Sequence, residues 1–229
     1  PLPRRSPPMN LRLQRMFGRA RRFLRRFHPR ERRFARLHAT FAASVRGAHI
    51  VALNDARKIF RTVRSCRARR ALDLGTGIGA SAAFIAAAMR EEGQVWSVEQ
   101  DASYTKEAER LMPPKLAPKV HMSVSDAYSF TTTLAPGHTF AGYRTLPLHG
   151  APFDFVLVDG PGSFMENGMV VRYPNGDLFN LLPYLALQCT IFIDRRHRSA
   201  ALYEQFLGKH FAHTVRARTY SVFVYEKYI

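Results

Sequence analysis

Short apolar runs alternate with longer amphipathic segments from residue 71 onward. Five of the runs predict strands, because they are four to eight residues long, mainly apolar and bounded by Gly, Pro or polar residues. They are residues 71–74, 94–99, 119–125, 153–160 and 190–194. The segments between them predict helices over residues 80–92, 178–189 and 198–210, and one that Asp101 or Ser103 caps and that runs to Leu111.

The chain ends in two further segments with strand character, residues 213–220 and 221–228, with almost no loop between them. Such a pair predicts an antiparallel hairpin. Alternation of strands and helices predicts a parallel sheet with helices on both of its faces. The expected fold class is therefore α/β: a doubly wound, mostly parallel seven-stranded sheet with a C-terminal antiparallel hairpin, preceded by N-terminal helices.

The N-terminal part has a different pattern. Residues 11–27 carry apolar side chains at three- and four-residue steps, and arginines fill most of the remaining positions, which predicts a basic amphipathic helix. A second helical face comprises Phe34, Leu37, Phe41 and Val45, and a third helical stretch spans residues 50–63. We therefore expect a basic amphipathic arm over residues 1–36 and a folded domain over residues 37–229.

Charged residues are distributed unevenly along the chain. The net charge is +18, yet residues 1–70 hold 21 Lys and Arg against two acids, whereas residues 71–229 hold 14 against 15. A basic arm favours a polyanionic partner, so residues 4–36 predict contact with an anionic membrane surface or with nucleic acid. Docking on a partner chain and a merely solvated tail are the alternatives.

Location follows from two observations. No run of 18 apolar residues occurs, so no transmembrane helix is predicted. Only two cysteines are present, far apart, which favours free thiols in a reducing compartment. We expect a cytoplasmic protein, with peripheral association at a membrane as the alternative.

The first strand leads into a glycine-rich turn, "LDLGTGIGASAAF" over residues 72–84. Such turns between a strand and a helix approach a nucleotide-like ligand closely. The dinucleotide fingerprint is GxGxxG, but here the third glycine comes one position early and Asp73 precedes the first. A carboxylate repels a pyrophosphate but accepts hydrogen bonds from an ammonium group. The spacing thus favours a cationic ligand that carries an amino acid.

The pattern DxGxGxG followed by an Ala-rich helix resembles motif I of the class I S-adenosylmethionine-dependent methyltransferases. Three acids in order and the terminal hairpin also match, so the resemblance covers residues 71–229. It implies that Glu99 binds the ribose hydroxyls, that Asp126 lies near the adenine amino group, and that Asp159 lies at the edge of the reaction site. The implied S-adenosylmethionine-binding residues are Asp73, Gly75, Thr76, Gly77, Gly79, Glu99, Gln100, Asp126 and Ala127.

Transfer to a hydroxyl requires a base or a metal ion to remove the proton. Asp159 and Asp194 end neighbouring strands, where they are expected to converge on one cleft. We predict Asp159, Asp194 and His197 as catalytic residues, and Asp159 with Asp194 as the ligands of a divalent metal. Metal-dependent O-methyltransferases carry DGxH and a paired acid, whereas this chain has "DGPGSF" and "IDRRHR". The departure makes it more similar to methyltransferases of sugar or uronic-acid hydroxyls.

The resemblance implies O-methylation of a small-molecule or glycosidic hydroxyl. The long connections over residues 135–152 and 162–179 are expected to form the acceptor pocket, and arginines at 172, 195, 196 and 198 to bind an anionic acceptor. An RNA methyltransferase that uses the basic arm is one alternative, and a non-catalytic module anchored to a membrane or partner is another. The glycine spacing disfavours a dehydrogenase, and the GGGDG motif of aminopropyltransferases is not found.

Overall fold

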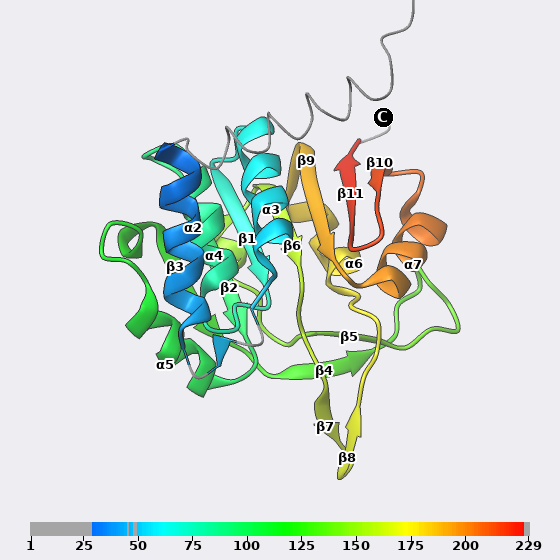
Figure 1. The fold of residues 1–229 in the computed structure, drawn as a ribbon. Coiled ribbons are helices and arrows are strands. Elements are labelled where there is room, and N and C mark those ends of the chain that lie inside the picture. The colour runs from blue at the N-terminus through cyan, green and yellow to red at the C-terminus, as the bar shows by residue number, and fades with distance from the viewer. Residues whose placement is uncertain (1–28, 45, 48–49, 227–229) are drawn as a thin grey trace, which may run out of the picture.

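A seven-stranded sheet forms the centre of the molecule (Figure 1). The structure is a computed structural model that describes residues 29–44, 46–47 and 50–226. In chain order the strands of this sheet are β1 (Arg70–Leu74), β2 (Gln94–Glu99), β3 (Val120–Val124), β6 (Phe153–Val158), β9 (Leu185–Asp194), β10 (Phe211–Arg216) and β11 (Tyr220–Tyr225).

The strands lie in the order β10-β11-β9-β6-β1-β2-β3. Neighbours from β9 to β3 run parallel, whereas β11 runs antiparallel to both β9 and β10. This confirms the expected mostly parallel sheet with its terminal hairpin. From β1 the chain goes first to β2 on one side and later to β6 on the other. The connections therefore diverge at the carboxyl ends of β1 and β6, where open α/β sheets bind ligands.

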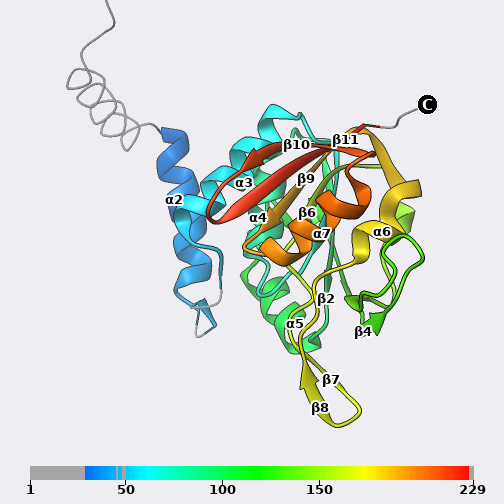
Figure 2. The ribbon, with the colours of Figure 1, turned by 90° about the vertical axis from the view of Figure 1, so that its right-hand side faces the viewer.

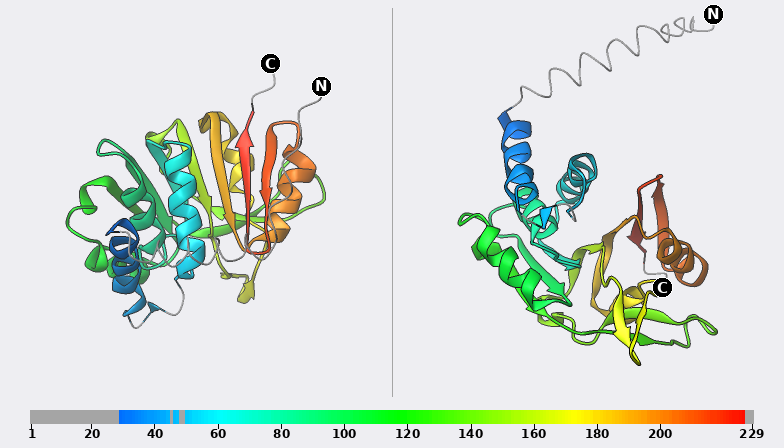
Figure 3. Two further views of the ribbon diagram at one scale, coloured as in Figure 1. Left: turned by 45° about the horizontal axis from the view of Figure 1, so that its top comes forward. Right: turned by 60° about the horizontal axis from the view of Figure 1, so that its bottom comes forward.

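Helices cover both faces of this sheet (Figures 2 and 3). One face carries α2 (Pro29–Ala42), α3 (Leu53–Ser65), α4 (Ala80–Ala88) and α5 (Ala102–Leu111), and the other carries α6 (Asp177–Leu181) and α7 (His197–Leu207). Successive strand residues point to opposite faces. Ala71 accordingly packs with the α2–α4 side and Leu72 with the α6–α7 side, and both are fully buried.

The second predicted helical face is confirmed in α2. Phe34 and Phe41 are buried, and their rings lie 5.1 and 6.2 Å from that of Phe84 in α4. The predicted boundary between residues 36 and 37 falls inside this continuous helix. The predicted helix over residues 11–27, Val45 and most of the basic arm lie outside the described residues, so the arm stays a prediction.

The helix predicted over residues 178–189 is wrong beyond Tyr184. The segment contains α6, a short 3-10 turn over Leu182–Tyr184, and then the first five residues of β9. Pro183 lacks the amide hydrogen that a longer helix needs. Leu185 instead pairs with Phe153 of β6, and both side chains are buried. The helix predicted over residues 80–92 also ends early, at Ala88.

The two long connections contain strands that the pattern does not predict. β4 (Ala127–Phe130) pairs with β5 (Phe140–Tyr143), and β7 (Phe164–Glu166) pairs with β8 (Met169–Val171). Figure 1 shows the β7–β8 hairpin protruding beyond the carboxyl edge of the sheet. Among the described residues, no helix is long and apolar enough to cross a membrane.

Candidate active site

The glycine loop joins β1 to α4 at the carboxyl edge of the sheet. Gly75 and Gly77 have positive φ angles of 108° and 49°, which residues other than glycine rarely adopt. A Cβ on Gly75 would lie 2.6 Å from the Gly160 nitrogen, and one on Gly79 would lie 2.9 Å from the Ala108 Cβ. A Cβ on Gly77 would meet nothing within 4 Å. Two glycines thus permit close packing, whereas Gly77 borders open space that a ligand can fill.

Asp73 lies in β1, just before the glycine loop, and helps to hold the loop in place. Its side chain is completely buried, and Oδ2 accepts hydrogen bonds from the hydroxyls of Ser81 and Ser97 at 2.9 and 2.8 Å. The Ser97 hydroxyl also lies 2.5 Å from that of Thr76. Burial raises the pKa of Asp73 to about 7, although the two serine hydrogen bonds oppose this rise. The other carboxylate oxygen, Oδ1, has no partner, so it remains available as a buried acceptor.

Glu99 ends β2 and reaches across to the glycine loop. One carboxylate oxygen accepts from the Gly77 amide at 2.7 Å, and the other accepts from the amides of Gln100 and Asp101 at 2.9 and 3.2 Å. A carboxylate offers about four lone-pair directions, so capacity remains for another donor. Gln100 donates to the Ser163 carbonyl, while its own Oε1 is buried without a partner.

Asp126 and Ala127 lie at the next strand end. They follow β3, which is the neighbour of β2 in the sheet. Ser125 lies between β3 and Asp126, and its backbone amide donates to the Glu99 carbonyl at 2.9 Å. The Asp126 side chain is exposed, and Ala127, half-buried, begins β4. The structure therefore brings the predicted cofactor residues to one edge of the sheet, in the order of β1, β2 and β3.

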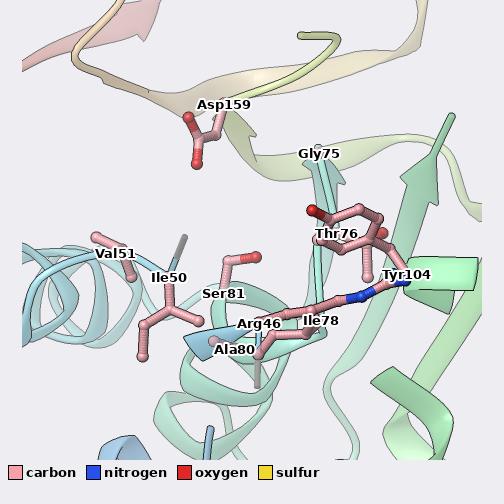
Figure 4. Close-up of a pocket in the computed structure, with 11 residues that line it drawn as sticks. Arg46, Ile50, Val51, Gly75, Thr76, Ile78, Ala80, Ser81, Tyr104 and Asp159 are labelled. Carbon is pink, nitrogen blue, oxygen red and sulfur yellow. The ribbon is translucent and has the colours of Figure 1, made fainter. Parts of the chain in front are cut away.

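A cavity of about 50 Å³ lies against the glycine loop (Figure 4). Arg46, Tyr104 and Asp159 line it together with the loop and with Ile50 and Val51. The Arg46 guanidinium lies 4.4 Å from the centre of the Tyr104 ring. It also donates to the Ser103 hydroxyl at 2.9 Å. Sequence reasoning missed Arg46 and Tyr104, because no motif distinguishes them and only the fold brings them to the loop.

Asp159 lies directly after β6 and faces this cavity (Figure 4). Its amide donates to the Leu74 carbonyl at 2.9 Å, which ties the end of β6 to the end of β1. Burial, followed by the negative charge of Asp194, raises the pKa of Asp159 to about 7, although Arg196 opposes this rise. The side chain is 43% exposed, so water in the cavity reaches it and moderates the effect of burial.

Arg196 and Asp194 both interact with Asp159. Arg196 donates to the Asp159 carbonyl, and its Nε lies 3.9 Å from the Asp159 carboxylate. Asp194 is only 4% exposed, and its Oδ1 has no partner. Burial, followed by the charge of Asp55, raises the pKa of Asp194 to about 6. Asp194 does not line the cavity, so it influences Asp159 through its charge.

His197 lies outside the cavity. It is exposed at the first position of α7 and lines a second recess, of about 320 Å³, together with arginines 172, 195, 196 and 198. Within the described ranges, no three His, Cys, Asp or Glu side chains are grouped so as to hold a metal ion. The predicted metal pair, Asp159 and Asp194, has the Arg196 cation beside it and stays a prediction.

A buried network that the sequence did not predict fixes the turn after Asp159. The side-chain amide nitrogen of Asn175 donates to the Gly160 carbonyl and to the Asp177 carboxylate, both at 2.7 Å. The side-chain oxygen of Asn175 accepts from the Tyr203 hydroxyl at 2.5 Å. Asp177 also accepts from the Tyr143 amide at 3.0 Å. Burial raises the pKa of Asp177 to about 7, against the effect of these bonds. The network connects β5, α6 and α7 to the candidate catalytic acid.

Comparison with known proteins gives a family and a fold. The profile of the methyltransferase domain family matches residues 72–205. No curated protein sequence matches the chain. A methyltransferase from Geobacter sulfurreducens has a similar structure, with a TM-score of 0.58 and 14% identity over 91% of this chain and 97% of that one. The structure of an O-methyltransferase from Bacillus cereus in complex with SAH is also similar, with a TM-score of 0.54 and 17% identity over 84% of this chain and 90% of that one. For a SAM-dependent O-methyltransferase from Thermotoga maritima, the TM-score is 0.51 and the identity is 17%, over 79% of this chain and 67% of that one.

Proposed function

This chain belongs to the methyltransferase domain family, and from that premise we propose that it transfers a methyl group from S-adenosylmethionine to a hydroxyl oxygen of a small molecule. The observation that carries the proposal is one cavity lined by both the glycine loop and Asp159. The loop is suited to hold the methyl donor, and the carboxylate is suited to accept a proton from the acceptor.

Three features of the site fit S-adenosylmethionine. Gly77 borders open space, and Asp73 and Gln100 each present a buried oxygen without a partner. Asp73 would attract the ammonium group, Glu99 and Gln100 would hold the ribose, and Asp126 would hold the adenine amino group. We assign the carboxylate of the methionine part to Arg46, because its guanidinium lines the same cavity. The O-methyltransferase from Bacillus cereus, which has a similar fold, is a complex with SAH, and this supports S-adenosylmethionine as the cofactor.

S-adenosylmethionine supplies an electrophilic methyl group on a sulfonium centre. The protein must then hold the acceptor oxygen in line with that group and remove its proton. Asp159 is positioned for the second task, since it faces the cavity and its pKa of about 7 lies near neutral pH. Arg196 fixes Asp159 through the carbonyl hydrogen bond, and the network around Asn175 fixes the following turn. Both groups therefore act as positioning residues.

Cys66 and Cys189 are free thiols, which supports a reducing, cytoplasmic location. Residues 4–36 are proposed to contact an anionic membrane surface or nucleic acid, on charge alone. Neither contact is needed for the chemistry at Asp159.

Transfer of a labelled methyl group tests the function. The full chain is incubated with methyl-labelled S-adenosylmethionine and, separately, with a small-molecule cell extract and with total RNA. The proposal expects label in a small molecule, with the methyl resonance of an O–CH₃ group in the NMR spectrum of the purified product. Label confined to RNA, or a product methylated on nitrogen or carbon, would overturn the O-methylation of a small molecule.

A further inference from the structure

The second recess differs in charge from the cavity at the glycine loop. Two segments line it: residues 172–174, which follow β8, and residues 195–199, which lead into α7. Its volume is about 320 Å³, and four arginines face it, with no acid among the lining residues. Positive charges gathered at one recess favour a negatively charged ligand there.

Part of this charge is already compensated within the protein. Arg195 forms an ion pair with Asp55 at 3.2 Å, and Arg196 lies beside Asp159. Arg172 and Arg198 are exposed and form no ion pair with any residue that the structure describes. Among the described residues, nothing compensates these two positive charges, which match the two negative charges of a phosphate monoester near neutral pH.

The recess also borders the proposed reaction site. Arg196 lines the recess and donates to the carbonyl of Asp159, whose carboxylate faces the cavity at the glycine loop. A molecule anchored among these arginines would extend toward Asp159. Anchoring of this kind supplies the orientation that methyl transfer requires.

We propose that this arginine recess binds a phosphate group of the acceptor, so that the substrate is a hydroxyl compound that carries a phosphate. The inference rests on the proposed function and specifies its substrate class. Arginine suits this role because its planar fork forms paired hydrogen bonds with phosphate oxygens. A carboxylate carries only one negative charge and would leave one of the two arginines without a counter-charge.

Calorimetric titration of the full chain with inorganic phosphate, and separately with acetate at the same ionic strength, tests the inference. We expect phosphate to bind more tightly than acetate. Arg172→Gln and Arg198→Gln should each weaken phosphate binding roughly tenfold, the effect of losing one charged hydrogen-bonding partner. Arg90→Gln is the matched control: Arg90 is exposed and lines a different basic recess, with Arg64 and Arg67. That variant should bind phosphate as the wild type does.

Three results would overturn the inference: no phosphate binding by the wild type, equal binding of acetate, or an equal loss in Arg90→Gln. Where a glutamine variant fails to fold, Arg172→Lys and Arg198→Lys replace it. They keep the charge but lack the fork, so a partial loss is expected and no loss contradicts the inference. Affinity for S-adenosylhomocysteine is measured in parallel. Wild type that binds this product but not phosphate refutes only the substrate class, whereas failure to bind the product refutes the proposed function.

Discussion

Replacing Gly77 with alanine separates ligand binding from folding. The added methyl group meets no protein atom within 4 Å, and the Gly77 amide can still donate to Glu99. The positive φ of 49° costs about 1–2 kcal/mol for a residue with a Cβ. The methyl group would occupy space assigned to the cofactor, and overpacking of this kind costs about 1–3 kcal/mol. We therefore expect a modest loss of stability and about 5- to 150-fold weaker binding of S-adenosylhomocysteine.

Gly137→Ala is the matched control for this variant. Gly137 also has a positive φ, 77°, and open space around its Cβ position, but it lies in the exposed connection between β4 and β5. Urea unfolding should show similar losses of stability for both variants, and calorimetry should show a loss of affinity for Gly77→Ala alone. Equal affinities of Gly77→Ala and wild type, or an equal loss in Gly137→Ala, would refute the assigned ligand position.

The remaining predictions concern the base and the core. Asp159→Asn should lower kcat/KM about 10²- to 10⁴-fold once the acceptor is identified. A base must be ionised, so wild-type kcat/KM should rise with pH up to about 7 and level off above it. An Asn variant with the same pH profile as the wild type would exclude Asp159 as the base. Phe84→Ala should lower the free energy of unfolding in urea by about 3–5 kcal/mol, because this ring is completely buried against Phe34 and Phe41. A loss below about 1 kcal/mol would contradict the packing of α2 on the domain.

Elements that local pattern determines could be predicted from the sequence. β2 has the predicted bounds, residues 94–99, because polar or glycine residues flank a short apolar run. Asp101 caps α5 as expected, accepting a hydrogen bond from the Ser103 amide at 2.7 Å. The meeting of Asp159 with the glycine loop follows from the predicted parallel sheet, since parallel strands bring their carboxyl ends to one edge.

Elements that depend on distant partners could not be predicted from the sequence. Residues 185–189 belong to an apolar run compatible with helix or strand, and pairing with β6 decides for the strand. The β4–β5 hairpin likewise depends on contact across the connection formed by residues 131–139, which contains few apolar residues. Asn175 becomes part of the site through Tyr203 and Gly160, 28 and 15 positions away. Arg46 does so through Tyr104, and nothing near either residue indicates the contact.

The carboxyl edge of the sheet, where the glycine loop lies, is expected to bind S-adenosylmethionine. Calorimetric titration of the folded full chain with S-adenosylhomocysteine, alongside NAD at the same concentration, tests it most directly. We expect saturable binding of S-adenosylhomocysteine at about one molecule per chain, with no binding of NAD, because the glycine spacing and Asp73 disfavour a pyrophosphate. Folded protein that binds NAD, or that does not bind S-adenosylhomocysteine, would contradict it.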